Sequence, residues 1–351
     1  MCDKIFSMEL IQPVFKKYQW GSQTKLQDMF SVTKNGEKLA EAWFGSHKNG
    51  DNISKIYKSD LPYLFKVLAV EKCLSLQVHP DKLTAVKGFQ SEQEKGLAID
   101  SPTRVFKDSN SKPEMAVALS PFLVAVGVKS SKAQEKFELI LENKANISVE
   151  QLDKITQKIQ NRLKKAKPGE LNNLLAEQAF LYARQDYPDD PTALLLLEMN
   201  VEKLHPGEAV YLPDGVIHAY IRGECLEIMK NSDNVFRAGL TNKYIDTNLV
   251  LRYTNFTPLA SYQPDIINKT IYSTNYLPKD AGFGIMLVNC RAKNKIIDLT
   301  GPKIVLGLDG KFEINGQLVT RGQAFFVPNK EKICVNSLSK LGQGKFAIAH
   351  I

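Results

Sequence analysis

Apolar and polar residues alternate over residues 74–79, which read Leu-Ser-Leu-Gln-Val-His. In a strand, this period of two puts the three polar side chains on one face. Mainly apolar segments flank the stretch at 61–70 and 115–128, so we expect the polar face to line a pocket. The amide of Gln77 and the imidazole of His79 would then point the same way and supply half of a metal site.

Similar short patterns, bounded by turn residues, predict further strands in several parts of the chain. They cover residues 17–22, 40–45, 61–68, 112–119, 193–200, 303–308, 311–314 and 346–351. Residues 82–110 are polar and show no firm period, so we expect a loop there that has room for one short helix. The pattern therefore predicts a mainly β protein.

Helical spacing appears in one place, an insert over residues 130–191. Ser148 precedes apolar residues at helical intervals, and Gln151 three positions later completes a capping box. We expect two or three helices, interrupted at residues 168–169. Their charged faces indicate a solvated bundle without chemistry of its own.

A second informative stretch follows the insert. Gly207, Pro213, Gly215 and His218 have the spacing of the second cupin motif, in which tight turns precede a strand that carries a histidine into a jelly-roll barrel. The motif ends in asparagine, where this chain has Arg222.

The outline Gly-x5-Pro recurs at Gly322 and Pro328, with Ile333 at the spacing of the earlier histidine. Cupin (jelly-roll) barrels, two in number, with an all-helical insert are therefore the expected fold. The expected division is a catalytic cupin domain at 1–129 and 192–256, the helical insert at 130–191, and a second jelly-roll-like domain without a metal site at 257–351.

Four polar residues on these elements form a candidate metal site: Gln77, His79, Glu114 and His218. Two imidazoles, a carboxylate and an amide oxygen suit a divalent ion, and zinc is the first choice because nothing demands redox chemistry. We expect one Zn²⁺ per chain. The cations Lys82, Lys112 and Arg237 lie near these residues in sequence and would be repelled unless an anion bound there too. Phosphate is the commonest such anion.

Composition and charge indicate the class of protein and the kinds of partner that this chain can bind. At 351 residues, with 43% hydrophobic and 24% charged residues, the chain reads as soluble and globular, with two or three structural units. The net charge of +8 comes from scattered lysines, without an aromatic-rich RNA-binding signature, so we expect no nucleic acid partner.

No apolar run is long enough to span a bilayer, and no signal peptide is expected. Five widely spaced cysteines predict reduced thiols and a cytoplasmic location.

Several segments together resemble class I mannose-6-phosphate isomerases, a family in the cupin superfamily. They are the Leu-Ser-Leu-Gln-Val-His-Pro-Asp-Lys stretch, Lys-Pro-Glu-Met at 112–115, Pro-x-Gly-x-x-His-Ala-Tyr at 213–220 and Ser-Asp-Asn-Val-Phe-Arg-Ala-Gly-Leu-Thr at 232–241. Tyr-x-Trp-Gly-Ser and Ala-Glu-x-Trp near the N-terminus match as well. The likeness spans residues 18–245 and is loose beyond them.

The resemblance implies interconversion of mannose 6-phosphate and fructose 6-phosphate through an enediol intermediate, with zinc on the four ligands named above. It implies Arg237 as the catalytic arginine. Lys112 and Glu227 are further catalytic candidates, Glu227 as the base. Substrate contacts are expected from Trp20, Ser75 and Lys82.

One position departs from the family pattern. Members commonly carry His-Lys-Pro-Glu, whereas this chain has Ser111 before Lys112. A serine hydroxyl is too weakly acidic to replace a proton-transferring histidine unaided. The sequence therefore leaves the identity of the catalytic base open.

Two alternatives remain at this stage. The first is a cupin oxygenase that holds iron(II) on similar ligands, and the second is a sugar-phosphate-binding cupin without catalysis. The partner expected in the main interpretation is a small phosphosugar, bound by a monomer that contacts no membrane.

Overall fold

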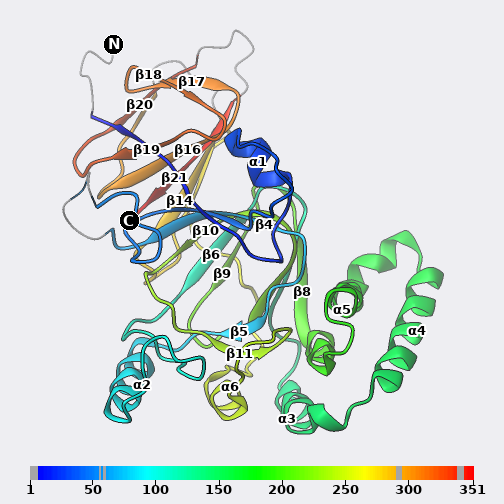
Figure 1. Ribbon diagram of the computed structural model, residues 1–351. Coiled ribbons are helices and arrows are strands. Elements are labelled where there is room, and N and C mark those ends of the chain that lie inside the picture. The colour runs from blue at the N-terminus through cyan, green and yellow to red at the C-terminus, as the bar shows by residue number, and fades with distance from the viewer. Residues whose placement is uncertain (1–6, 55–56, 58–60, 290–294, 338–343) are drawn as a thin grey trace.

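The computed structural model describes residues 7–54, 57, 61–289, 295–337 and 344–351, and strands predominate in it (Figure 1). Ten strands from the first 240 residues form one antiparallel sheet system. They are β2 (Val14–Lys16), β3 (Glu41–Phe44), β4 (Leu64–Val70), β5 (Leu76–Val78), β6 (Glu114–Ala118), β7 (Phe122–Val128), β8 (Met199–Leu204), β9 (Ala209–Leu212), β10 (His218–Met229) and β11 (Phe236–Gly239).

Strand β10 organises this sheet system because it pairs with four others. At 12 residues it is the longest strand in the described ranges. Its first residues pair with β5 and β7, and its later residues pair with β4 and β6. One continuous strand therefore carries side chains into both ends of the same sheet system.

The C-terminal part forms two further antiparallel sheets, one of seven and one of four strands within the described residues. The larger contains β1 (Glu9–Ile11), β12 (Ile266–Lys269), β13 (Ser273–Tyr276), β14 (Gly284–Asn289), β16 (Lys303–Asp309), β19 (Ala324–Val327) and β21 (Lys345–His350). The smaller contains β15 (Lys295–Ile297), β17 (Lys311–Ile314), β18 (Gln317–Thr320) and β20 (Ile333–Ser337). Strand β1 pairs with β19, so the N-terminal strand belongs to the C-terminal sheet.

Buried aromatic side chains join the two halves of the molecule. Phe44 and Phe65 from the first sheet system share one core cluster with Phe326 from the seven-stranded sheet and with Phe283, which directly precedes β14, and each is 0% exposed. Burial of such a cluster is the main favourable contribution to folding. It fixes the C-terminal sheets as a rigid support for the first sheet system.

Helices lie outside the sheets (Figure 1). They are α1 (Lys25–Phe30), α2 (Lys82–Glu94), α3 (Ala133–Asn143), α4 (Val149–Lys165), α5 (Leu175–Asp186) and α6 (Thr247–Tyr253), with the 3₁₀ helices η1 (Lys144–Asn146), η2 (Pro168–Leu174) and η3 (Pro191–Glu198). The predicted insert is confirmed as helical, and Ser148 and Gln151 form the capping box. No helix in the described ranges is long and apolar enough to span a membrane.

Two strand predictions are wrong, and one helix is longer than expected. Residues 17–22 form a turn after β2 rather than a strand, and residues 193–198 lie in η3, so strand β8 begins only at Met199. The stretch 82–94 is a helix of 13 residues, begun by Asp81, whose side chain accepts a hydrogen bond from the Thr84 amide.

The cysteine prediction is correct only in part. Cys73 and Cys225 are free and buried, but Cys334 is disulfide-bonded. Cys2 and Cys290 lie outside the described residues.

Candidate active site

Three neighbouring strands bring the predicted site residues into one row. In the order β11, β5 and β10, Arg237 lies opposite Gln77, and Gln77 lies opposite His218. Residues directly opposite each other in adjacent strands present their side chains on the same face. The row forms because β5, only three residues long, is paired on both sides.

His218 of this row forms a buried cluster with His79 and Glu114, and the ligand atoms of the three residues all lie within 4.8 Å of one another. The Glu114 carboxylate sits between the rings, with Oε1 at 3.4 Å from His79 Nε2 and Oε2 at 3.2 Å from His218 Nε2. Exposed fractions of these three side chains are at most 2%. Two imidazoles and a carboxylate converging in this way suit a zinc ion.

Backbone carbonyls orient both imidazoles. His79 Nδ1 donates to the Asn234 carbonyl at 2.7 Å, and His218 Nδ1 donates to the Val216 carbonyl at 2.9 Å. With the hydrogen on Nδ1, each Nε2 keeps its lone pair for a metal. His79 Nε2 is buried without a hydrogen-bond partner among the described residues, and such an orphaned acceptor fits a metal ligand.

The charges around the cluster favour metal binding as well. Burial, with a contribution from the Lys112 charge, lowers the pKa of His79 to about 4, so this imidazole is neutral at pH 7. Burial would raise the pKa of Glu114, but Lys112 and His79 outweigh it and hold the pKa well below its usual range. The Lys112 ammonium lies 2.9 Å from Glu114 Oε1.

Gln77 is turned away from a ligand orientation. Its amide nitrogen lies 3.3 Å from His218 Nε2, and its oxygen accepts a long bond of 3.4 Å from Ser75 Oγ. Rotation of the amide plane by half a turn would exchange the two atoms and bring the oxygen to the cluster.

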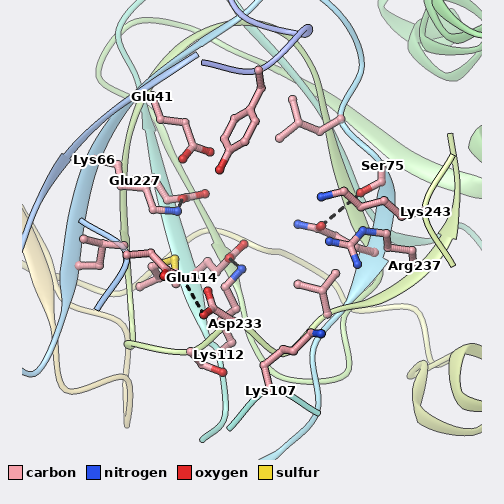
Figure 2. A pocket seen from close by; sticks show the side chains of 18 of the residues that line it. Glu41, Lys66, Ser75, Lys107, Lys112, Glu114, Glu227, Asp233, Arg237 and Lys243 are labelled. Carbon is pink, nitrogen blue, oxygen red and sulfur yellow. Dashed lines mark hydrogen bonds and ion pairs between the residues drawn. The ribbon is translucent and has the colours of Figure 1, made fainter. Parts of the chain in front are cut away.

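Glu114 of the cluster and the neighbouring Gln77 line a cavity of about 720 Å³, which is within the size range of small-molecule sites. Figure 2 shows Glu41, Lys66 and Glu227 on one side of this cavity and Ser75, Arg237 and Lys243 on the opposite side. Glu114, Lys112 and Asp233 lie between the two groups. The two walls therefore differ in charge.

The wall with Arg237 and Lys243 is cationic. Burial lowers the pKa of Arg237, and burial together with the Arg237 charge lowers the pKa of Lys243. Neither side chain has an ion-pair partner in the described part of the chain. Two desolvated cations beside the Ser75 hydroxyl form a site for an anion.

The opposite wall contains a buried ion pair. Lys66 Nζ lies 2.8 Å from Glu227 Oε2, and the two residues face each other in the register of β4 and β10. Burial raises the pKa of Glu227 despite the Lys66 charge. Burial alone would lower the pKa of Lys66, but Glu227 and Glu41 raise it. A carboxylate with a raised pKa beside a cavity is suited to proton transfer.

Asp233, at the cavity rim, is engaged away from Arg237. Its Oδ1 lies 3.3 Å from His47 Nε2 and its Oδ2 lies 3.5 Å from Lys48 Nζ. The backbone amide of Asn49 donates to His47 Nδ1, which leaves the Nε2 hydrogen for Asp233. Asp233 therefore forms no ion pair with Arg237 in the described part of the chain.

Comparison with known proteins agrees with this site. A family model described as phosphomannose isomerase type I, catalytic domain, matches residues 48–131. Mannose-6-phosphate isomerase of Salmonella typhimurium is 32% identical, over 69% of this chain and 73% of that protein. The chain belongs to the mannose-6-phosphate isomerase family.

Other members of the mannose-6-phosphate isomerase family match more of the chain. The protein from Rattus norvegicus is 27% identical, over 91% of this chain and 93% of its own length. A crystal structure of the Salmonella typhimurium protein bound to its substrate F6P and to zinc is 25% identical, with a TM-score of 0.77 over 98% of this chain and 99% of that one. The family that the motifs indicated is thus confirmed.

The structure brings most of the residues expected from this family to the cavity. Trp20, Ser75, Lys112, Glu227 and Arg237 all line it. Lys82 does not, because it begins helix α2 and its ammonium donates to the Ser109 carbonyl and to Asn110 Oδ1. Ser111, at the position of the usual family histidine, is buried.

The charged cavity residues that were given no role from sequence include Lys66 and Lys243. A signal for Lys66 was present, because a single lysine inside the apolar strand 64–70 requires a buried counter-ion. Lys243 stands six residues after Arg237, but nothing in its local sequence separates it from a surface lysine.

Proposed function

We propose that this protein is a zinc-dependent aldose-ketose isomerase that interconverts mannose 6-phosphate and fructose 6-phosphate through an enediol intermediate. The observation that carries the proposal is one cavity that reaches a buried His-Glu-His cluster through Glu114 and is also lined by two cations, Arg237 and Lys243, without an ion-pair partner among the described residues. A zinc-dependent sugar phosphate isomerase must bind both a metal ion and the phosphate group of its substrate.

His79, Glu114 and His218 would hold the zinc, with Gln77 as the fourth ligand after its amide turns. The orphaned Nε2 of His79 and the carbonyl-bound Nδ1 atoms support this assignment. Bound there, zinc supplies a Lewis acid for the oxygens on C1 and C2 of the sugar.

The phosphate belongs on the cationic wall. Lys243 and the Ser75 hydroxyl would bind its oxygens, and Arg237 would lie between the phosphate and the reacting carbons, since its strand neighbour is Gln77. We assign Arg237 to neutralise the negative charge that develops as the enediol forms, a role in which one preorganised donor contributes about 3 kcal/mol.

Glu227 is the proposed base. It would take the proton from C2 of open-chain mannose 6-phosphate and return it to C1, while the proton of the C2 hydroxyl passes to the oxygen on C1, so that the aldehyde becomes an alcohol and C2 becomes the ketone of fructose 6-phosphate. The raised pKa of the carboxyl group suits a group that must both accept and donate. Lys112 would hold Glu114 in its orientation through their 2.9 Å contact.

We also propose the finer architecture expected from the cupin resemblance. Residues 1–129 and 192–256 would form a catalytic jelly-roll, 130–191 its helical insert and 257–351 a second jelly-roll-like unit without a metal site. Support comes from the antiparallel pairing throughout the sheets. Trp20, stacked on Tyr18 at 5.7 Å between ring centroids, would close one side of the sugar site.

The test is turnover of mannose 6-phosphate by purified protein, before and after removal of zinc by a chelator and again after zinc is restored. We expect activity to be lost on chelation and regained with zinc. Iron in place of zinc, with oxygen uptake, would favour an oxygenase, and tight binding of the sugar phosphate without isomerisation would favour a non-catalytic binder. Either result contradicts the proposal.

A further inference from the structure

The chain that returns from the helical insert contacts both strands of the cationic wall. This return segment, residues 186–192, joins α5 to η3. Two of its three aspartates, Asp186 and Asp190, do not line the cavity but bind backbone groups next to residues that do. The sequence analysis assigned the insert no chemistry.

The first contact is made before strand β5. Asp186 Oδ2 accepts a hydrogen bond from the Cys73 amide at 2.8 Å, and the Tyr187 hydroxyl donates to the Cys73 carbonyl at 2.9 Å. Both backbone groups of a fully buried residue are thus bound by two successive residues of the insert. Ser75 follows two residues later.

Arg222 completes this first contact. Its Nη1 lies 2.8 Å from Asp186 Oδ2, and its guanidinium lies over the Tyr182 ring at 4.5 Å. This is the residue that stands where the cupin motif has asparagine. The ion pair fixes Asp186 between β10 and the Cys73 amide, with side chains that are 21% and 5% exposed for Arg222 and Asp186 respectively.

The second contact is made at the end of strand β11. Asp190 Oδ2 accepts from the Leu240 amide at 3.0 Å, and Asp190 Oδ1 accepts from the Thr192 amide and hydroxyl at 2.9 and 2.6 Å. Leu240 has a φ of 53°, a left-handed conformation that a bulky residue adopts only when its surroundings impose it.

The return segment packs closely against the end of β11, which limits how far the two can move relative to each other. A Cβ on Gly239 would lie 2.0 Å from Thr192 Oγ1, so the return segment and β11 touch directly. The imposed turn at Leu240 sends the chain toward Thr241 and Lys243, which line the cavity. The return segment therefore determines where Lys243 stands relative to Arg237.

We propose that Asp186 and Asp190 are positioning residues that hold the Ser75 strand and the Arg237–Lys243 turn at the spacing needed for a phosphate group. The inference rests on the proposed function, since it concerns the anion site of that function. Neither aspartate touches the substrate. Each acts through a backbone amide on the residues that do, and errors in such positioning weaken the binding of the phosphate group.

The test compares Asp186→Ala, Asp190→Ala and the conservative Asp186→Asn with a matched control, Asp189→Ala, at the exposed neighbour in the same segment. Zinc content and thermal unfolding are measured first. The readouts are KM and kcat for mannose 6-phosphate and the dissociation constant of inorganic phosphate by calorimetry. If Asp186→Ala does not fold, Asp190→Ala and Asp186→Asn still decide the question.

We expect both alanine variants to raise KM and the phosphate dissociation constant about tenfold, the loss typical of one charged hydrogen bond, with zinc content unchanged. Asp186→Asn, which keeps an oxygen acceptor, and Asp189→Ala should stay close to wild type. Unchanged KM and phosphate affinity in both alanine variants would overturn the inference, as would a parallel loss of zinc. A wild-type protein without turnover would instead overturn the proposed function itself.

Discussion

Arg237 and Gln77 lie directly opposite each other on β11 and β5, and the same Gln77 faces His218 on β10. The guanidinium of the anion site and two residues assigned to the metal are therefore fixed by a single register. A slip of one residue in β5 would turn its side chains to the other face. The short strand β5 is held on both edges, which keeps the register.

Replacement of Arg237 should affect chemistry more than stability. We expect Arg237→Ala to lower kcat/KM by roughly 10²- to 10³-fold, because a preorganised cation is lost where negative charge develops. Arg237→Lys should recover only part of this loss, since an ammonium cannot replace the planar fork. Steady-state kinetics provide the measurement.

Arg321→Ala, at an exposed arginine, serves as the control and should keep wild-type kinetics. A variant Arg237→Ala whose kcat/KM stays within a factor of about three would remove Arg237 from the mechanism.

Loss of a ligand imidazole should remove zinc and activity together. His218→Ala leaves Glu114 with a single imidazole neighbour, so we expect substoichiometric zinc after dialysis and turnover below about 1% of wild type, since altering even an outer partner of a ligand costs 10- to 100-fold. Metal analysis and kinetics on the same sample measure both quantities. His205→Ala, at an exposed histidine, should retain both, and full zinc loading of His218→Ala would exclude His218 as a ligand.

Local pattern identified the residues of the site better than it identified their partners. The alternation at 74–79 and the Gly-Pro-Gly-His spacing located the metal cluster, because each signal lies within a few residues. Lys66 and Glu227 are 161 positions apart, and only the register of β4 and β10 joins them. No local pattern reports such a distance.

The elements that were predicted wrongly have local causes too. Residues 193–198 are mostly apolar, and a short apolar run does not distinguish a strand from a buried 3₁₀ helix. Helix α2 has a weak apolar face, so its period was missed, although Asp81 after Pro80 is a start signal. The insert was predicted correctly because its capping box coincides with a long amphipathic period.

The buried pair of Lys66 and Glu227 should be sensitive to removal of one member. Lys66→Met leaves Glu227 buried without a counter-ion, which typically costs about 3–5 kcal/mol. We expect that loss in the free energy of unfolding, measured with urea at pH 7.5. The double variant Lys66→Met with Glu227→Gln should regain part of it, because no buried charge then lacks a partner.

Lys158→Met, at an exposed lysine of α4, is the control and should change stability by less than about 0.5 kcal/mol. Equal stability of Lys66→Met and wild type would show that Glu227 takes up a proton at no cost or gains water, and would contradict a tight buried pair.

The pH dependence of the zinc-free protein should report on His79. Its pKa in the folded protein is about 4, lowered mainly by burial, whereas an imidazole in the unfolded chain titrates near 6.5. Between these values the unfolded state binds the additional proton, so stability rises with pH. The contribution is complete above pH 6.5 and is lost as the pH falls toward 4, by about 3 kcal/mol in total.

The measurement is urea unfolding of zinc-free wild type, His79→Gln and His205→Gln at pH 7.5 and 4.5. Other groups titrate in the same pH range, so the contribution of His79 is taken from the difference between the stability losses of the three proteins. His79→Gln should lose less stability than wild type on acidification, by about 3 kcal/mol, whereas His205→Gln should match wild type. Equal losses in all three proteins would mean that His79 is protonated in the folded state at pH 4.5, which would contradict its burial as a neutral ligand poised for zinc.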